Sequence, residues 1–67
     1  MLVAGKYNTY EVIQESANDD GTQRWFKLRC VDLFGVDDLG DQIMCSSLGQ
    51  ELWIANYHFR HMPVLAV

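Results

Sequence analysis

The chain has 67 residues, of which 49% are hydrophobic and 12% aromatic, and its nine acidic and five basic residues leave a net charge of −4. This length allows one small domain, residues 1–67, and a chain of this size buries only about 60% of the surface that its unfolded form exposes. The aromatic content argues against disorder, and the net acidity argues against a surface that attracts nucleic acid or anionic lipid by charge alone.

Localisation is predicted from two features that the sequence lacks. No hydrophobic run approaches the length of about 18 residues that a transmembrane helix needs, and the first residues lack the charged and apolar regions of a signal peptide. We therefore expect a cytoplasmic protein that does not enter a membrane. In that compartment Cys30 and Cys45 stay reduced, and we expect both to be small buried side chains.

The first half of the chain is typical of a β-hairpin. Residues 1–5 predict a short strand or an arm that ends or bends at Gly5, and residues 6–15 are rich in β-formers. Residues 16–21 (Ser-Ala-Asn-Asp-Asp-Gly) form a turn cluster. Residues 6–15 should therefore pair in antiparallel fashion with residues 22–34.

Residues 24–34 have the clearest periodicity in the chain. Phe26, Leu28 and Cys30 alternate with Lys27 and Arg29, as in a strand with one buried face. After Cys30 the apolar positions shift by one residue, which predicts a β-bulge or sharp bend between residues 30 and 32.

The second half is predicted to contain shorter elements. Residues 35–40 are bracketed by glycines and indicate a break, residues 41–46 a short strand and residues 47–50 a turn. Residues 51–61 fit a strand by composition. They also fit a helix over residues 48–61, with Ser47 as N-cap, Gln50 in a capping box and Pro63 after its end. We favour the strand, followed by a short edge strand at residues 64–67.

These elements predict a mostly β domain, a curved sheet or small barrel of the SH3 or OB type with four or five short antiparallel strands. The alternative is an α+β domain in which a helix at residues 48–61 covers a three-stranded sheet. Either fold leaves the function open.

A metal site is disfavoured by the spacing of its candidate ligands. Cys30, Cys45, His58 and His61 are the residue types that bind zinc. However, the cysteines do not form a close pair, and the histidines would share a face only on a helix. Asp32, Asp37, Asp38 and Asp41 do not follow the ligand spacing of a calcium loop, and we expect them to be solvated. We therefore expect no metal and no cofactor.

Two binding functions are compatible with the sequence, and we expect no enzymatic activity, because no nucleophile motif or phosphate-binding loop is present. The first is a non-catalytic protein-interaction module, such as a stand-alone inhibitor or regulator. It would use an acidic loop and exposed aromatic side chains, with candidates Trp25, Asp37, Asp38, Asp41, Trp53 and Tyr57. A free sheet edge can also pair with a second copy of the chain.

The alternative is a barrel that binds single-stranded nucleic acid. Aromatic faces stack on bases and neighbouring cations contact the backbone. The candidates are Arg24, Trp25, Lys27 and Arg29. The net acidity places this function second.

Overall fold

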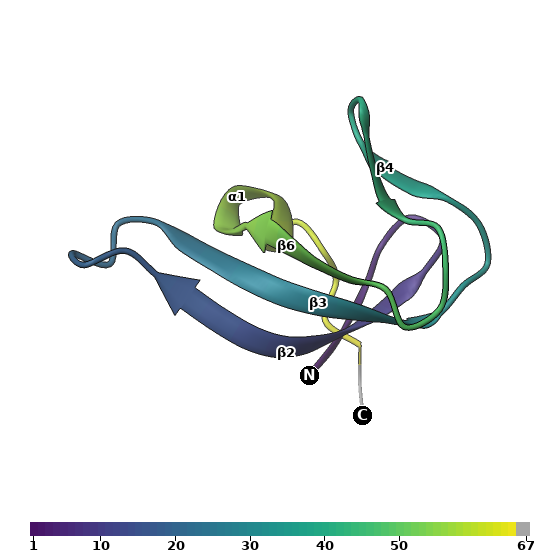
Figure 1. The fold of residues 1–67 in the computed structure, drawn as a ribbon, viewed down its shortest axis with the longest axis horizontal. Coiled ribbons are helices and arrows are strands. Elements are labelled where there is room, and N and C mark those ends of the chain that lie inside the picture. The colour runs from purple at the N-terminus through teal and green to yellow at the C-terminus, as the bar shows by residue number, and fades with distance from the viewer. Residues whose placement is uncertain (66–67) are drawn as a thin grey trace.

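The computed structural model describes residues 1–65, which form six strands and one helical turn. The elements are β1 (Leu2–Ala4), β2 (Thr9–Ala17), β3 (Arg24–Asp32), β4 (Asp37–Leu39), β5 (Gln42–Cys45), β6 (Glu51–Ala55) and α1 (Asn56–Phe59). Antiparallel β1, β2, β3 and β6 form one sheet in that order, and β4 pairs with β5 in a second sheet (Figure 1). The predicted mostly β fold is confirmed, but the four-stranded sheet is open and does not close into a barrel.

The hairpin predicted in the first half of the chain is confirmed as β2 and β3, which pair in antiparallel fashion. Its turn is held by side chains of the predicted turn cluster. Asn18 Oδ1 accepts a hydrogen bond from the Gln23 N–H at 3.0 Å, and Asp20 Oδ1 accepts one from the Thr22 N–H at 3.0 Å. Gly21 adopts a φ of 73°, which favours glycine.

The predicted bulge is also confirmed, and it lies at Val31. Thr9 pairs with Asp32 and Tyr10 pairs with Cys30, so Val31 has no partner in β2. A second bulge lies in β2 at Ile13, because Val12 pairs with Leu28 and Gln14 with Lys27. Each bulge inserts one extra residue into its strand. The side chains that follow it therefore point to the opposite face from the one that strict alternation would give them.

The break predicted at residues 35–40 is corrected by the structure, because these residues include the strand β4. Gly40, at a φ of 65°, and Asp41 form the turn that connects β4 to β5. The strand predicted at residues 41–46 is confirmed as β5. The turn at residues 47–50 is confirmed as well: the Gln50 N–H donates to the Ser47 carbonyl at 3.3 Å.

Residues 48–61 combine the two predicted alternatives. β6 pairs with β3 as far as Ala55, and a single helical turn then begins at Asn56. The predicted capping box is not used, because the N-cap of α1 is Ala55, which makes no side-chain hydrogen bond. Pairing with β3 explains this result, since it satisfies backbone groups of both strands and turns Leu52 and Ile54 towards the core.

The core lies between the four-stranded sheet and the elements packed on one of its faces. The ring of Phe59 in α1 stacks on Phe26 of β3, with 3.9 Å between centroids. The buried apolar residues are Val3, Tyr10, Phe26, Leu28, Cys30, Met44, Cys45, Ile54 and Phe59. They include the alternating residues predicted in β3 and both predicted cysteines.

The C-terminal segment covers the outer edge of β1, and Figure 1 shows it returning towards the N-terminus. Val64 forms a bridge with Val3, and the Leu65 N–H donates to the Leu2 carbonyl at 2.9 Å. Of the edge strand predicted at residues 64–67, residues 66 and 67 lie outside the described part. No helix in residues 1–65 is long and apolar enough to cross a membrane.

Candidate functional site: an aromatic surface on the open sheet face

One face of the main sheet is not covered by α1 or by the β4–β5 hairpin. Side chains of β3 alternate, so Trp25, Lys27 and Arg29 point away from the buried Phe26, Leu28 and Cys30. Paired residues of adjacent strands share a face. Trp53 therefore lies beside Lys27, with which it pairs in the register of β3 and β6. We call this face the outer face.

The aromatic residues predicted as binding candidates meet at the end of the sheet that carries α1. Trp25, Trp53 and Ser16 line a hollow of about 210 Å³. Trp25 also lines a second hollow of about 310 Å³, which extends to Tyr57 and the hairpin residues 22–24. Trp53 is 45% exposed and Tyr57 60% exposed, whereas Trp25 is half-buried. We name Trp25, Trp53 and Tyr57 the aromatic surface.

The basic residues of β3 are each paired with a carboxylate on a neighbouring strand. Lys27 Nζ lies 3.2 Å from a carboxylate oxygen of Glu51 and 5.9 Å from the ring centroid of Trp53. Arg29 forms an ion pair with Glu11, and Arg24 forms one with Glu15. Arg24 lies on the same face as Phe26, with its guanidinium 5.5 Å from the Phe26 ring centroid. Only Lys27 and Arg29 are therefore basic residues of β3 on the outer face, and each is paired with a carboxylate.

The acidic residues predicted to bind a partner do not join the aromatic surface. Asp38 and Asp41 are exposed on the β4–β5 hairpin, which Figure 1 shows at the opposite end of the main sheet from α1. The prediction that the acidic residues are solvated is wrong for Asp37, which is 1% exposed. Its carboxylate accepts hydrogen bonds from the Tyr7 N–H at 2.5 Å, the Asn8 N–H at 3.2 Å and the Tyr10 hydroxyl at 2.9 Å.

Asn8 completes this buried polar group, and sequence reasoning did not identify it. Its Oδ1 accepts from the Phe34 N–H at 2.8 Å and from the Gly35 N–H at 3.2 Å, while its Nδ2 donates to the Gly35 carbonyl at 3.0 Å. Gly5 lets the carboxylate approach, because a Cβ at this position would lie 2.1 Å from Asp37 Oδ2. We call Asn8, Tyr10 and Asp37 the polar hub. It joins the connection between β1 and β2 to the start of β4 and has a structural role.

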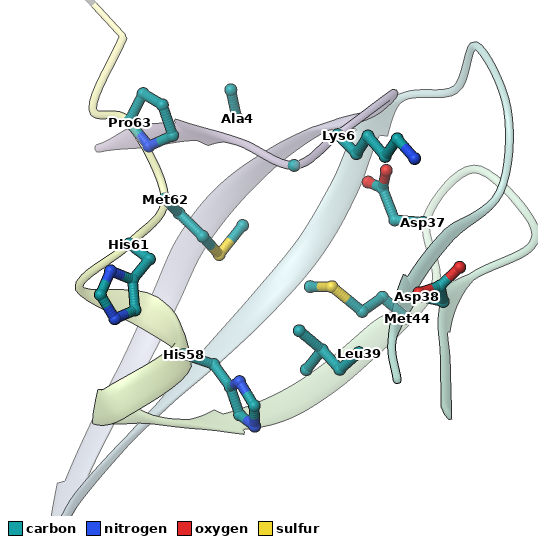
Figure 2. Close-up of a pocket in the computed structure, with 11 residues that line it drawn as sticks. Ala4, Lys6, Asp37, Asp38, Leu39, Met44, His58, His61, Met62 and Pro63 are labelled. Atoms are coloured by element: carbon teal, nitrogen blue, oxygen red, sulfur yellow. The ribbon is translucent and has the colours of Figure 1, made fainter. Parts of the chain in front are cut away.

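A third hollow, of about 330 Å³, lies on the covered side of the sheet, between β1, β4 and α1. Figure 2 shows His58 and His61 on one side of it and Asp37 and Asp38 on the other, with methionine and leucine side chains between them. The residues described by the structure contain no group of three or more side chains placed to hold a metal ion. Cys30, Cys45, His58 and His61 are therefore not brought together as ligands.

Two buried residues, Cys30 and Tyr10, have side-chain pKa values raised above their ordinary values. Burial, and to a smaller degree the neighbouring Cys45, raises the pKa of the Cys30 thiol from 9.0 to about 11. Burial also raises the pKa of Tyr10 above its ordinary value, with a further contribution from the carboxylate of Asp37. Both groups are therefore neutral in the folded chain at neutral pH.

We predict that the chain loses stability as the pH rises from 9 to 11. Because the folded pKa of Cys30 is raised, its contribution is complete below the unfolded pKa and is lost as the pH rises towards about 11. One such group lowers the free energy of unfolding by up to about 1.4 kcal/mol per pH unit. Urea denaturation at several pH values measures this slope. A Cys30→Ala variant should show a shallower slope, and equal slopes would contradict the assignment.

Comparisons of the chain with protein-family models, with curated proteins and with solved structures found no match. Its function has therefore to be inferred from its own residues and their geometry. Two arrangements are relevant: the aromatic surface on the outer face, with the hollows beside Trp25, and the polar hub, whose groups are already paired with one another. Of these two arrangements, the aromatic surface leaves side chains available to a partner.

Proposed function

We propose that the chain is a small non-catalytic module that binds another protein through the aromatic surface, acting as an inhibitor or regulator of that partner. The observation that carries the proposal is the hollow between Trp25 and Trp53 on the open sheet face. Aromatic side chains flanking a hollow are typical of interface hot spots, where a partner's apolar side chain is buried and water is excluded. The acidic residues Asp38 and Asp41 line neither hollow beside Trp25, and the proposal therefore rests on the aromatic side chains.

The ion pairs on the sheet favour a protein partner over nucleic acid. Binding to a phosphate backbone requires free cations, and each phosphate contact must be made by a Lys or Arg that is available for it. Lys27, Arg29 and Arg24 would have to give up Glu51, Glu11 and Glu15. Single-stranded nucleic acid is the second candidate, because Trp25, Lys27 and Arg29 do share the outer face.

The proposal is tested by affinity capture with matched variants. The tagged chain, Trp25→Ala, Tyr57→Ala and the control Phe34→Ala are each incubated with cell extract, with and without nuclease. Phe34 is 74% exposed and does not line either hollow beside Trp25. We expect a captured protein that survives nuclease and that binds Trp25→Ala at least about tenfold more weakly, which corresponds to about 1.4 kcal/mol. Phe34→Ala should bind like the unmodified chain.

The same experiment separates the two candidate functions. A partner held by aromatic contacts should stay bound as salt is raised, whereas nucleic-acid binding should weaken steeply. The double variant Lys27→Glu/Arg29→Glu should abolish nucleic-acid binding. Recovery of nucleic acid, with loss of the associated proteins after nuclease, would replace the first function with the second. Capture of a protein equally by all variants would show that the aromatic surface is not the binding site.

A further inference from the structure

The strand β6 lies at an edge of the main sheet, with β3 on one side and, in the described part of the chain, no strand on the other (Figure 1). The Cys30 N–H donates to the Gln50 carbonyl directly opposite it, at 2.9 Å. Hydrogen-bonded pairs alternate along an antiparallel ladder, so Leu52 and Ile54 also bond to β3. The N–H and carbonyl groups of Glu51 and Trp53 and the N–H of Ala55 therefore point away from β3, towards the free edge, while the carbonyl of Ala55, the N-cap of α1, accepts a hydrogen bond within the helical turn.

Within residues 1–65, this edge lacks the features by which proteins usually prevent strand pairing. Such features include proline, bulges, inward-pointing charges and a covering segment. The only proline is Pro63, the pairing of β3 with β6 has no register shift, and the one charged residue in β6, Glu51, is already paired with Lys27. At the other side of the sheet, residues 63–65 cover β1. The part of β2 that extends beyond β1 contains the bulge at Ile13.

We infer that β6 pairs in antiparallel fashion with β6 of a second copy, and that the two-fold axis passes between the two Trp53 residues. In this register Trp53 pairs with the same residue of the second copy, and Glu51 pairs with its Ala55. The two Trp53 residues then exchange two hydrogen bonds, and the Ala55 N–H of each copy donates to the Glu51 carbonyl of the other, which gives about four hydrogen bonds. The four-stranded sheets of the two copies join into one continuous sheet. This inference concerns self-association and does not depend on the proposed function.

The side chains favour a second copy as the occupant of this edge. The dimer places no like charges opposite each other, because each Glu51 faces an alanine. On the covered face, Leu52 of each copy lies directly opposite Ile54 of the other, so apolar side chains continue across the junction. On the outer face, two tryptophans that are each 45% exposed become neighbours. A chain of this size gains from the additional burial, because its own core is small.

The first test is the mass of the purified chain in solution as a function of concentration. Sedimentation or light scattering should show a reversible rise from 7.7 kDa towards twice that mass between about 10 µM and about 1 mM, the range expected of a small interface. Ala55→Pro should weaken association at least about tenfold, because proline removes an outward N–H. The φ of Ala55 is −73°, so the backbone already suits proline.

A pair of charge substitutions tests the register itself. Ala55→Lys places a cation opposite Glu51 of the second copy and should tighten the dimer, whereas Ala55→Glu places like charges there and should weaken it. The matched control is Val36→Lys and Val36→Glu, at an exposed residue outside β6, and neither should change association. This pair decides the question if Ala55→Pro does not fold, as judged by circular dichroism.

Two results would overturn the inference. One is a chain that stays at the mass of a single copy up to about 1 mM, since a weaker contact would have no consequence at cellular concentrations. The other is a dimer that is unaffected by the Ala55 substitutions, which would place the contact elsewhere. Trp25→Ala, which is used above against an external partner, should leave the dimer intact. A failed dimer and a failed partner surface are therefore distinguished.

Discussion

Replacement of Asp37 by alanine is expected to leave the chain largely unfolded at room temperature. The substitution removes the acceptor for the N–H groups of Tyr7 and Asn8 and for the hydroxyl of Tyr10. A buried donor that loses its partner costs about 1–3 kcal/mol. A domain of this size rarely has more than about 3–5 kcal/mol of stability in total, so the combined loss is comparable to the whole stability of the chain.

Asp38→Ala is the matched control for this prediction, because it removes the same group from the next residue, which is exposed. Urea denaturation followed by circular dichroism should show a normal transition for Asp38→Ala and little or no folded baseline for Asp37→Ala. Asp37→Asn keeps one carbonyl acceptor and should fall between the two. If Asp37→Ala had the same denaturation midpoint as Asp38→Ala, the polar hub would not contribute to stability.

The second large effect is expected at the centre of β3. Leu28 has no exposed surface and pairs with Val12 on one side and Leu52 on the other. Leu28→Ala should lower the free energy of unfolding by about 2–5 kcal/mol, because it removes buried apolar area and leaves a cavity that neighbouring strands cannot close. Backbone hydrogen bonds hold β2 and β6 in register with β3, so these strands cannot move far enough to fill the cavity.

Leu48→Ala is the corresponding control, since Leu48 lies in the turn before β6 and is 63% exposed. Surface substitutions of this kind change stability by no more than about 0.5 kcal/mol. Thermal and urea denaturation of both variants measure the difference. A Leu28→Ala variant as stable as Leu48→Ala would mean that the centre of β3 is not the centre of the core.

The local features of the fold were predictable because each depends on neighbouring residues. The turn cluster at residues 16–21 specifies the β2–β3 hairpin, and the shift of the apolar pattern after Cys30 marks the bulge at Val31. The position of Trp25 on the face opposite Phe26 follows from the same alternation. Trp25 and Trp53 are candidates that the sequence predicts, and the structure adds that they line one hollow.

The polar hub was not predictable, because its members are far apart in the chain. Asp37 is 30 residues from Tyr7 and 27 from Tyr10, and in the sequence it stands beside Asp38 in a stretch typical of a solvated turn. The choice between strand and helix at residues 48–61 had a similar origin. Capping residues and apolar spacing are local signals for a helix, and pairing with β3 overrides them as far as Ala55.

By itself, the sequence determines the mostly β class, the β2–β3 hairpin with its bulge, and the aromatic and basic residues that share one face of β3. These properties arise from side-chain alternation and turn chemistry, which act over a few residues. Only the tertiary structure decides which carboxylates are free and which strand edge is left open. Asp37 is buried while Asp38 is exposed, and residues 63–65 cover β1 while no strand among residues 1–65 pairs with the free edge of β6. Burial and strand pairing depend on contacts between segments that are distant in the chain. A periodic pattern within one segment therefore does not predict them.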